Sequence, residues 1–248
     1  MAPDWLIARP IAHRGLHDRA AGRPENTRAA ARAAAAGGFA IECDVQLSAD
    51  GEAMVFHDAA LGCLTEASEP VSSRTVAELV RMTVAGTPET IPTLPEFLAA
   101  GGGAVPMIVE VTSRHDGDLR LATRAAEVAS AYGGPVALKS FDPQVVAALR
   151  GLVPEGVPRG IVAETTQDDP AYAALPLATR LALSNLLHFA DTRPDFLSWR
   201  VDDLPCAPTY LCRLLGRLPV MAWTVRTDGQ RVRAAEHADQ MVFEGFVP

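Results

Sequence analysis

The sequence predicts an α/β fold organised as one (β/α)8 barrel with an insertion after the second strand. Two observations carry this prediction. Eight short β-rich runs alternate with Ala- and Arg-rich helical stretches, a pattern that favours βαβ units and a parallel sheet. The 248 residues also contain no linker rich in Gly, Ser or Pro, and eight such strands at this length are typical of the barrel. A doubly wound open sheet is the alternative, although it usually has fewer strands at this length.

The predicted strands are short apolar runs, and the predicted helices are the stretches between them. Short apolar runs bounded by turn-forming residues are typical of buried strands. The strands are expected at residues 10–13, 40–46, 107–111, 136–140, 160–163, 196–201, 220–225 and 241–244. The helices include residues 26–36, 118–132, 143–152, 207–215 and 228–238.

One segment breaks this alternation. After the second strand, the pair Asp50-Gly51 reverses the chain into residues 53–57, which is a hairpin-like pattern. Residues 58–93 then form a long excursion before the next barrel strand. An insertion of this length is usually a lid or a binding element, and the alternative is a surface excursion that closes nothing. We therefore expect a single domain over residues 1–248 with an insertion at about 58–93.

Composition and charge narrow the class of protein. The 22 basic and 30 acidic side chains give a net charge of −8, and 48% of the residues are apolar. These values are typical of a globular protein and argue against a disordered chain. A net acidic chain also argues against nucleic-acid binding through a broad basic surface. A phosphate-bearing substrate must therefore meet positive charge that is concentrated in one place.

The cysteines and the apolar stretches bear on location. No two of the four cysteines form a CxxC pair, so we interpret them as free thiols, mostly buried, in a reducing compartment. The first ten residues lack the basic region of a signal peptide. The uncharged residues 97–109 are too few to span a bilayer. We therefore expect a cytoplasmic protein with no stable membrane anchor.

Three acidic residues in apolar strands point to a cation site. Glu42 and Asp44 lie two apart in the second predicted strand, so their side chains share one face. Two carboxylates in a low-dielectric core need a cationic partner. Arginine can serve, but a divalent cation such as Mg²⁺ or Ca²⁺ is the better hypothesis because it takes oxygen ligands. Glu110, in the next barrel strand, is interpreted as a third ligand. The alternatives are a salt-bridged pair at a strand end and, for Glu110, a solvent-facing glutamate.

Two histidines at strand ends are the candidate acid–base groups. His13 ends the first predicted strand and His57 ends the hairpin strand, and at the carboxyl ends of barrel strands both would point toward the carboxylates. Imidazoles titrate near neutral pH, so one could accept a proton while the other protonates a leaving oxygen. The remaining histidines lack such a setting and are interpreted as surface or packing residues: His17, His115, His188 and His237.

An ordered set of motifs covers the chain from about residue 11 to the C-terminus. The motifs are, in order, His13-Arg14-Gly15, Pro24-Glu25-Asn26-Thr27, Glu42-x-Asp44, Asp50-Gly51, His57-Asp58, Thr93-Leu94-Pro95-Glu96-Phe97-Leu98, Glu110, Ser140-Phe141-Asp142 and Trp223-Thr224-Val225. A single His-Arg-Gly would be a weak signal, whereas the ordered set is highly specific. Together the motifs resemble the glycerophosphodiester phosphodiesterases.

The resemblance implies a TIM-barrel phosphodiesterase that hydrolyses a glycerophosphodiester to glycerol 3-phosphate and an alcohol. By motif, His13 and His57 match the general acid and base of the family. The family's ligands for a divalent cation, Mg²⁺ or Ca²⁺, are matched by Glu42, Asp44 and Glu110. The chemistry is consistent, because attack on a phosphodiester builds negative charge that a metal and an arginine would stabilise.

The resemblance also implies contacts with the substrate. Arg14 matches the arginine that contacts the phosphate, and Trp223 matches an aromatic residue at the mouth of the barrel that would pack on the glycerol. We place Glu25 and Asn26 as supports of the site. Asn26 or Thr27 can also cap the helix that follows.

The chain departs from the family pattern at a few positions. The family usually carries a lysine two residues after the third metal-binding glutamate, where this chain has Thr112. Lys139, its only lysine, ends the next predicted strand. We expect Lys139 to face the barrel interior and to supply part of the lost phosphate contact; the alternative is a lysine that reaches solvent. In addition, Glu244 stands where an aspartate is common, and Cys63 where an arginine is common.

Three hypotheses about function follow. The first is an active metal-dependent phosphodiesterase with a small-molecule substrate. The second is a catalytically weakened or non-catalytic barrel that binds a phosphodiester, for which Thr112 argues, although the retained histidines and carboxylates favour activity. The third is a barrel phospholipase of the sphingomyelinase D type, against which the sequence offers no signal peptide and no exposed apolar or basic membrane patch. The sequence does not choose between the glycerol hydroxyl and water as nucleophile, nor does it identify the alcohol, the metal or the oligomeric state.

Overall fold

The computed structural model describes residues 2–168 and 170–248. The strands are β1 (Ile11–Ala12), β2 (Ala40–Leu47), β3 (Ala53–Val55), β4 (Met107–Val111), β5 (Val136–Ser140), β6 (Arg159–Ala163), β7 (Phe196–Arg200), β8 (Val220–Val225) and β9 (Gln240–Phe243). The helices are α1 (Arg28–Ala36), α2 (Val76–Leu79), α3 (Leu94–Ala100), α4 (Arg120–Ala131), α5 (Pro143–Leu152), α6 (Pro170–Ala173), α7 (Leu177–Ser184), α8 (Phe189–Thr192), α9 (Ala207–Gly216) and α10 (Asp228–His237).

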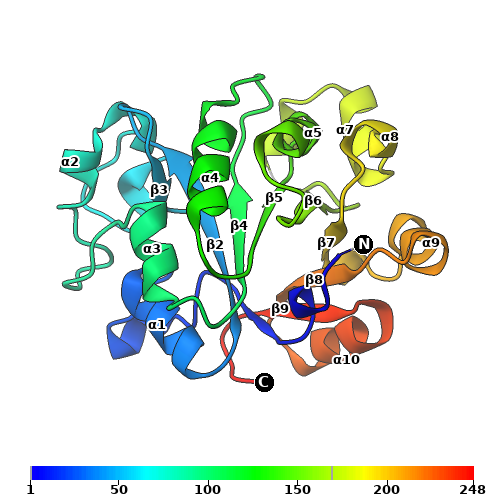
Figure 1. Ribbon diagram of the computed structural model, residues 1–248, viewed down its shortest axis with the longest axis horizontal. Helices are drawn as coiled ribbons and strands as arrows, with labels where there is room; N and C mark the ends of the chain where they lie inside the picture. Colours follow the sequence, from blue (N-terminus) through cyan, green and yellow to red (C-terminus); the bar gives the residue numbers. More distant parts are fainter. Residues whose placement is uncertain (1, 169) are drawn as a thin grey trace.

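Eight parallel strands form a closed ring at the centre of the molecule (Figure 1). They follow the order β1-β9-β8-β7-β6-β5-β4-β2, and β1 also pairs with β2, which closes the ring. The predicted (β/α)8 barrel is therefore confirmed, and the open sheet is excluded. The carboxyl ends of all eight strands meet at one end of the barrel, where the strand-end residues of such a fold converge.

Apolar side chains fill the amino-terminal half of the barrel interior. A short 3-10 helix, Asp4–Leu6, covers this end and buries Leu6 completely. The side chains that pack with Leu6 come from the barrel strands: Ile11, Ala40, Ile108, Ala137, Phe196, Met221 and Val242. This packed layer closes the barrel at the amino-terminal ends of the strands. A substrate can therefore reach the interior only from the carboxyl ends.

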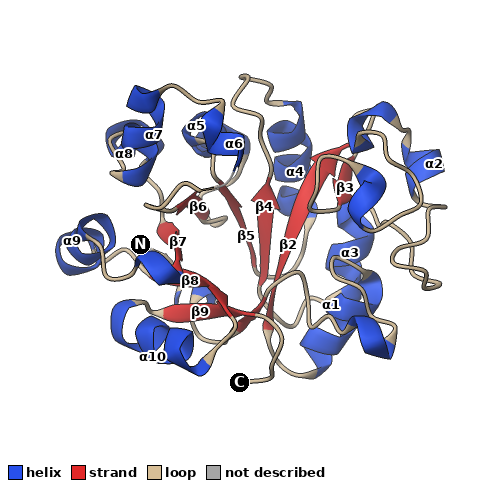
Figure 2. Cartoon of the chain, turned by 180° about the vertical axis from the view of Figure 1, so that it is seen from behind, coloured by secondary structure: helices blue, strands red, loops and turns tan. Residues whose placement is uncertain are grey.

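Helices surround the ring of strands and bury their apolar stripes against it (Figure 2). α4 illustrates why the sequence folds this way, because its buried residues recur at helical spacing. They are Leu121, Ala122, Ala125, Ala126, Val128 and Ala129. The alanines allow the helix axis to lie close to the strands, and the polar face with Arg124 remains at the surface.

The hairpin and the insertion lie beside the barrel rather than over its mouth. Gly51 has a φ of +89° in the turn between β2 and β3, a left-handed conformation that favours glycine. The following segment, at the left of Figure 1, has a hydrophobic cluster of its own. Its buried members are Met54, Phe56, Leu61, Val71, Leu79, Val84 and Ile91. None of residues 58–93 is among the described residues that line the cavity at the carboxyl ends of the strands, which favours the surface-excursion interpretation over a lid.

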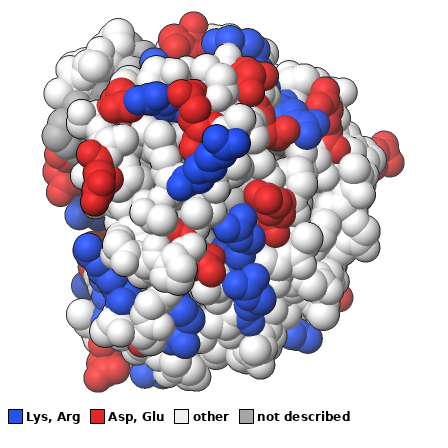
Figure 3. Space-filling model, turned by 90° about the vertical axis from the view of Figure 1, so that its left-hand side faces the viewer, with Lys and Arg blue, Asp and Glu red and all other residues white. Residues whose placement is uncertain are grey.

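The surface differs from the expectation in one respect. Large apolar side chains are exposed on α7 and α9, among them Leu177 and Leu181 on α7 and Leu214 and Leu215 on α9, so the expectation of no exposed apolar patch was wrong. The residues that these helices bury are Leu183 and Ser184 on α7 and Thr209 on α9, and the named leucines remain outside. On the face drawn in Figure 3, basic and acidic side chains are interspersed. Among the described helices, none is long and apolar enough to cross a membrane.

The cysteines are free thiols, as predicted. Their burial is less uniform than expected. Cys43 is buried in β2, Cys206 and Cys212 are half-buried, and Cys63 is exposed. Cys63 lies in the insertion, where the chain covers itself with only a small cluster, and this explains why its thiol reaches the surface.

Candidate active site

Three carboxylates converge inside the barrel near the carboxyl ends of β2 and β4. In the register of these strands, Asp44 lies opposite Glu110, and Glu42 lies one layer deeper, opposite Ile108. One oxygen of each carboxylate lies within 4.8 Å of the others. Glu42 and Asp44 are almost completely buried. We call Glu42, Asp44 and Glu110 the acidic triad, and the predicted convergence of its members is confirmed.

The acidic triad fits a divalent cation. It offers only oxygen ligands, which hard cations such as Mg²⁺ and Ca²⁺ prefer. Glu42 Oε1 is buried and lies 3.0 Å from Lys139 Nζ, so this oxygen already accommodates a positive charge. The separation of the ligand atoms, at most 4.8 Å, allows one ion to contact all three carboxylates.

Lys139 faces the interior of the barrel, as predicted, and does not reach solvent. Its position on β5 is opposite Glu110 in the strand register. Its Nζ lies 3.0 Å from Glu42 Oε1 and 3.0 Å from Glu110 Oε2, and the side chain is 3% exposed. By contrast, the Thr112 hydroxyl donates a hydrogen bond to the carbonyl of Val45 at 2.7 Å. The ammonium beside Glu110 therefore belongs to the neighbouring strand β5.

Arg14 is held at the mouth of the barrel by acidic and backbone partners. Its Nη1 donates to Glu25 Oε1 at 2.6 Å, and its Nε lies 3.3 Å from Asp44 Oδ2. Its backbone N–H donates to Glu42 Oε2 at 3.1 Å. The Asn26 side-chain amide donates to Asp44 Oδ2 at 3.0 Å. Glu25 and Asn26 therefore lie where the sequence predicts, each in contact with a central residue of the site.

The turn after β1 brings these groups together. Arg14 has a φ of +55° and Gly15 a φ of +79°, a left-handed pair that redirects the chain sharply. A Cβ on Gly15 would come within 2.8 Å of the Ala30 backbone in α1, so the chain needs glycine here for both conformation and space. Thr27 caps α1 by accepting a hydrogen bond from the Ala30 N–H, as one of the two predicted caps.

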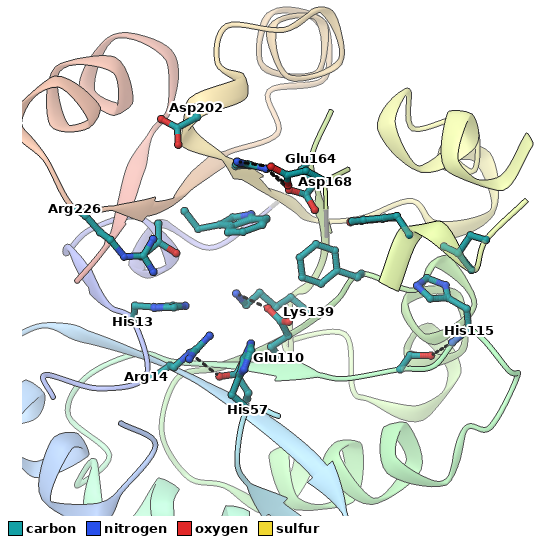
Figure 4. Close-up of a pocket in the computed structure, with 18 residues that line it drawn as sticks. His13, Arg14, His57, Glu110, His115, Lys139, Glu164, Asp168, Asp202 and Arg226 are labelled. Atoms are coloured by element: carbon teal, nitrogen blue, oxygen red, sulfur yellow. Dashed lines mark hydrogen bonds and ion pairs between the residues drawn. The ribbon is translucent and has the colours of Figure 1, made fainter. Parts of the chain in front are cut away.

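Each candidate histidine is oriented by a carboxylate. His13 Nδ1 shares a hydrogen bond of 2.8 Å with Glu244 Oε2, and His57 Nδ1 shares one of 2.7 Å with Asp58 Oδ1. When a carboxylate accepts from Nδ1–H, the tautomer is set and Nε2 is available for proton transfer. We call His13 and His57 the histidine pair. The two imidazoles lie on the same wall of one cavity as Arg14 (Figure 4).

The charges of the site shift its ionisation. Burial raises the pKa of Glu42, but Lys139, His13 and Arg14 lower it by more, so that its pKa lies well below the usual range. The pKa of Glu110 is raised by burial and by the neighbouring carboxylates, against the effect of Lys139. Burial lowers the pKa of His57, but Asp44 and the hydrogen bond with Asp58 raise it on balance.

A cavity of about 490 Å³ opens above these residues. In Figure 4, His13, Arg14, His57, Glu110 and Lys139 lie together, and Glu164 and Asp168 lie across the cavity from them. Trp223 lines the cavity, as predicted, and its ring packs edge-on against Phe141 with centroids 5.5 Å apart. A ligand that carries an anionic group next to an apolar group can therefore fit in this cavity.

The sequence analysis missed several residues of the cavity wall. His115, interpreted there as a surface or packing residue, lines the cavity 3.8 Å from Asp142, because the loop after β4 turns back over the barrel mouth. Arg200 pairs with Glu164 at 3.2 Å and with Asp168 at 2.7 Å. Only the position of Arg200 at the end of an apolar strand could have signalled this pair. His17, His188 and His237 are not among the described residues that line the cavity.

Glu244 binds both His13 and Arg226, at 2.8 Å in each case. The contact with His13 lowers the pKa of Glu244 to about 2, so the carboxylate is charged at neutral pH. We expect Glu244→Gln to lower kcat by about tenfold or more with little change in KM, because the His13 tautomer is no longer imposed. Steady-state kinetics will check this result. Glu244→Asp, which keeps the charge, should recover part of the loss, and a Gln variant with wild-type kcat would contradict the role.

Comparison with known proteins places the chain in a family. The glycerophosphoryl diester phosphodiesterase family matches residues 13–244. No curated protein matches the chain. Among solved structures, a phosphodiesterase of Oleispira antarctica in complex with the product sn-glycerol 3-phosphate is 22% identical, with a TM-score of 0.76 and coverage of 96% of this chain and 93% of its own.

A second solved structure, a glycerophosphodiester phosphodiesterase of Thermotoga maritima, is 21% identical, with a TM-score of 0.71 and coverage of 94% of this chain and 92% of its own. At these identities the solved structures show the shared barrel fold. The family match begins at His13 and ends at Glu244, so it spans every residue of the site. The chain therefore belongs to the glycerophosphoryl diester phosphodiesterase family and is an enzyme of that class.

Proposed function

We propose that the protein hydrolyses a glycerophosphodiester to glycerol 3-phosphate and an alcohol, by acid–base catalysis of the histidine pair beside a divalent cation held by the acidic triad. The observation that carries this proposal is the arrangement of one cavity wall. Two carboxylate-oriented imidazoles, Arg14 and two members of the acidic triad, Asp44 and Glu110, occur together there, and Glu42 lies one layer deeper in the barrel. A barrel that only bound a ligand would not need two imidazoles with defined tautomers.

The phosphodiester group would bind between Arg14 and Lys139, which both line the cavity. Arg14 is fixed by Glu25 and Asp44, so its guanidinium is already oriented when the anion arrives. Negative charge grows on the phosphate oxygens during attack, and fixed cations stabilise that charge more than the ground state. A divalent cation bound to the acidic triad would add a Lewis acid beside these oxygens.

The histidine pair would divide the two proton transfers. One imidazole accepts the proton of the nucleophile, which is either the glycerol hydroxyl of the substrate or a water molecule. The other donates a proton to the oxygen of the departing alcohol. Asp44 and Asp58 raise the pKa of His57 against the effect of its burial, and such a group stays protonated to a higher pH, which suits the acid.

The position of Lys139 favours this function over a non-catalytic barrel. Thr112 lacks the charge that the family has at its position, but Lys139 places an ammonium in the same cavity. The ammonium has three N–H donors, and the two carboxylate contacts leave one for the substrate. We therefore retain hydrolysis as the function, with Lys139 as a phosphate contact.

A single assay tests the function and its metal dependence. Release of glycerol 3-phosphate is measured from glycerophosphocholine, glycerophosphoethanolamine and glycerophosphoglycerol, first with EDTA and then with Mg²⁺, Ca²⁺ or Mn²⁺ restored. We expect EDTA to lower the rate by about 100-fold or more, because the Lewis acid is lost, and one of the ions to restore it. Full activity in EDTA would contradict the metal dependence. No product with any substrate or ion would contradict hydrolysis.

We also propose that residues 1–248 act as one domain, with residues 58–93 as its insertion, and that the protein works in the cytoplasm. Free thiols at all four cysteines support a reducing compartment. The insertion packs on β3 and on α1, where Arg28 donates to Thr90 at 2.8 Å, and this supports its assignment to the same domain.

A further inference from the structure

The only lysine of the chain lies between two members of the acidic triad. Lys139 Nζ is 3.0 Å from Glu42 Oε1 and 3.0 Å from Glu110 Oε2. These contacts join β5 to β2 and β4, and the neighbour of Lys139 on β6 is Gly160, which adds no side chain to this layer. The ammonium is therefore held against the same carboxylates that a divalent cation would use.

Two fixed cations offset part of the negative charge of the site without any added ion, although one of them, Arg14, also pairs with Glu25. The three carboxylates face two fixed cations, Lys139 and Arg14. Unpaired buried carboxylates would destabilise the barrel strongly, so an internal partner keeps the site formed. The same partner opposes an added cation, because like charges repel at short range and because oxygens engaged by an ammonium are less available to a metal.

We propose that Lys139 is a built-in counter-ion that competes with the divalent cation for Glu42 and Glu110 and thereby sets the metal affinity of the site. This inference rests on the proposed function for its metal site. Coupling of this kind is reciprocal. The Lys139 ammonium weakens metal binding by a certain factor, and a bound metal weakens the contacts of the ammonium with the carboxylates by the same factor. Lys139 is thus a positioning residue for the carboxylates as well as a phosphate contact.

Metal affinity measured directly tests the inference. Isothermal titration calorimetry compares Mg²⁺, Ca²⁺ and Mn²⁺ binding to chelator-treated wild-type protein and to Lys139→Met, which has similar volume and no charge. We expect Lys139→Met to bind at least one of these ions about tenfold or more tightly. At saturating metal the same variant should turn over more slowly, because the phosphate contact is lost. Tighter metal binding with slower turnover is a combination that a merely structural role would not produce.

A matched control distinguishes the direct contact of Lys139 with the acidic triad from the general effect of positive charge in the cavity. Arg226 also lines the cavity, but its partner is Glu244 rather than a member of the triad. Arg226→Gln removes one positive charge and should change the metal affinity by about twofold or less, since a partly exposed charge is screened. Equal tightening in both variants would overturn the inference, and so would unchanged or weaker binding in Lys139→Met.

A second variant and a second measurement keep the inference testable if Lys139→Met does not fold. If Lys139→Met does not fold, Lys139→Gln, which keeps a polar head group, takes its place. Thermal unfolding followed by circular dichroism should show a larger metal-induced rise in Tm for the variant than for wild type; an equal or smaller rise would overturn the inference. Because these measurements use only metal ions, they remain decisive even if the substrate assay finds no hydrolysis.

Discussion

Substitution of either member of the histidine pair by alanine is expected to lower kcat for glycerophosphodiester hydrolysis by about 100- to 10,000-fold, the usual contribution of a positioned acid or base. The reason is geometric, since each imidazole lies on the cavity wall with its Nδ1 bound to a carboxylate. The measurement is the steady-state rate of glycerol 3-phosphate release with saturating metal. His13→Ala and His57→Ala combined should lose little more than the worse single variant, because both act in one reaction.

His237→Ala is the matched control for this experiment. His237 ends α10 at the surface, beside Glu236, and its loss should leave the rate within about twofold of wild type, as is usual for surface substitutions. Circular dichroism will establish that all three variants are folded. Retention of more than about a tenth of the activity by His13→Ala or His57→Ala would contradict the assigned chemistry.

The second large effect is expected at Asp44. Asp44→Asn should lower kcat/KM by about 1000-fold or more, which corresponds to several kcal/mol of lost transition-state stabilisation. Two roles of the carboxylate, in the metal site and in holding its neighbours, are lost together. Asp44 belongs to the acidic triad, and its Oδ2 also lies 3.3 Å from Arg14 Nε and 3.0 Å from the Asn26 amide. The substitution therefore weakens the metal site and releases the arginine that would bind phosphate.

Kinetics and calorimetry together check this prediction. Asp44→Asn should show both a loss of turnover and a weaker affinity for Mg²⁺ or Ca²⁺. Glu127→Gln is the control, because Glu127 is exposed on α4 and contacts Arg124 away from the cavity. Its kinetics and metal affinity should match wild type. Normal metal affinity and turnover in Asp44→Asn would show that the carboxylate is not a ligand.

Much of the fold was predictable because its signals are local. A buried parallel strand needs a short apolar run, and a covering helix needs a small-residue stripe at helical spacing; both are visible in the sequence. The pair Glu42 and Asp44 was also predictable, because residues two apart in a strand share a face. Glu110 and Lys139 followed by the same argument, as charged residues in apolar strands that face the barrel interior.

The partners of these residues were not predictable, because they depend on distant parts of the chain. His13 meets Glu244 across 231 positions, which requires that β9 pair with β1 and close the ring. The pairing of Arg200 with Glu164 and the position of His115 at the cavity depend on loop paths that no periodicity describes. Likewise, the leucines exposed on α7 and α9 follow the ordinary helical pattern, and only the docking of each helix decides which face is covered.

The sequence by itself determined the class of fold, the residue types of the site and the family, because apolar alternation and short motifs act within a few residues. Only the tertiary structure decided that the single lysine lies 3.0 Å from two members of the acidic triad and that the insertion lies beside the barrel. The physical reason is that ion-pair distances and the covering of a cavity depend on strand register and ring closure, which join residues far apart in the chain.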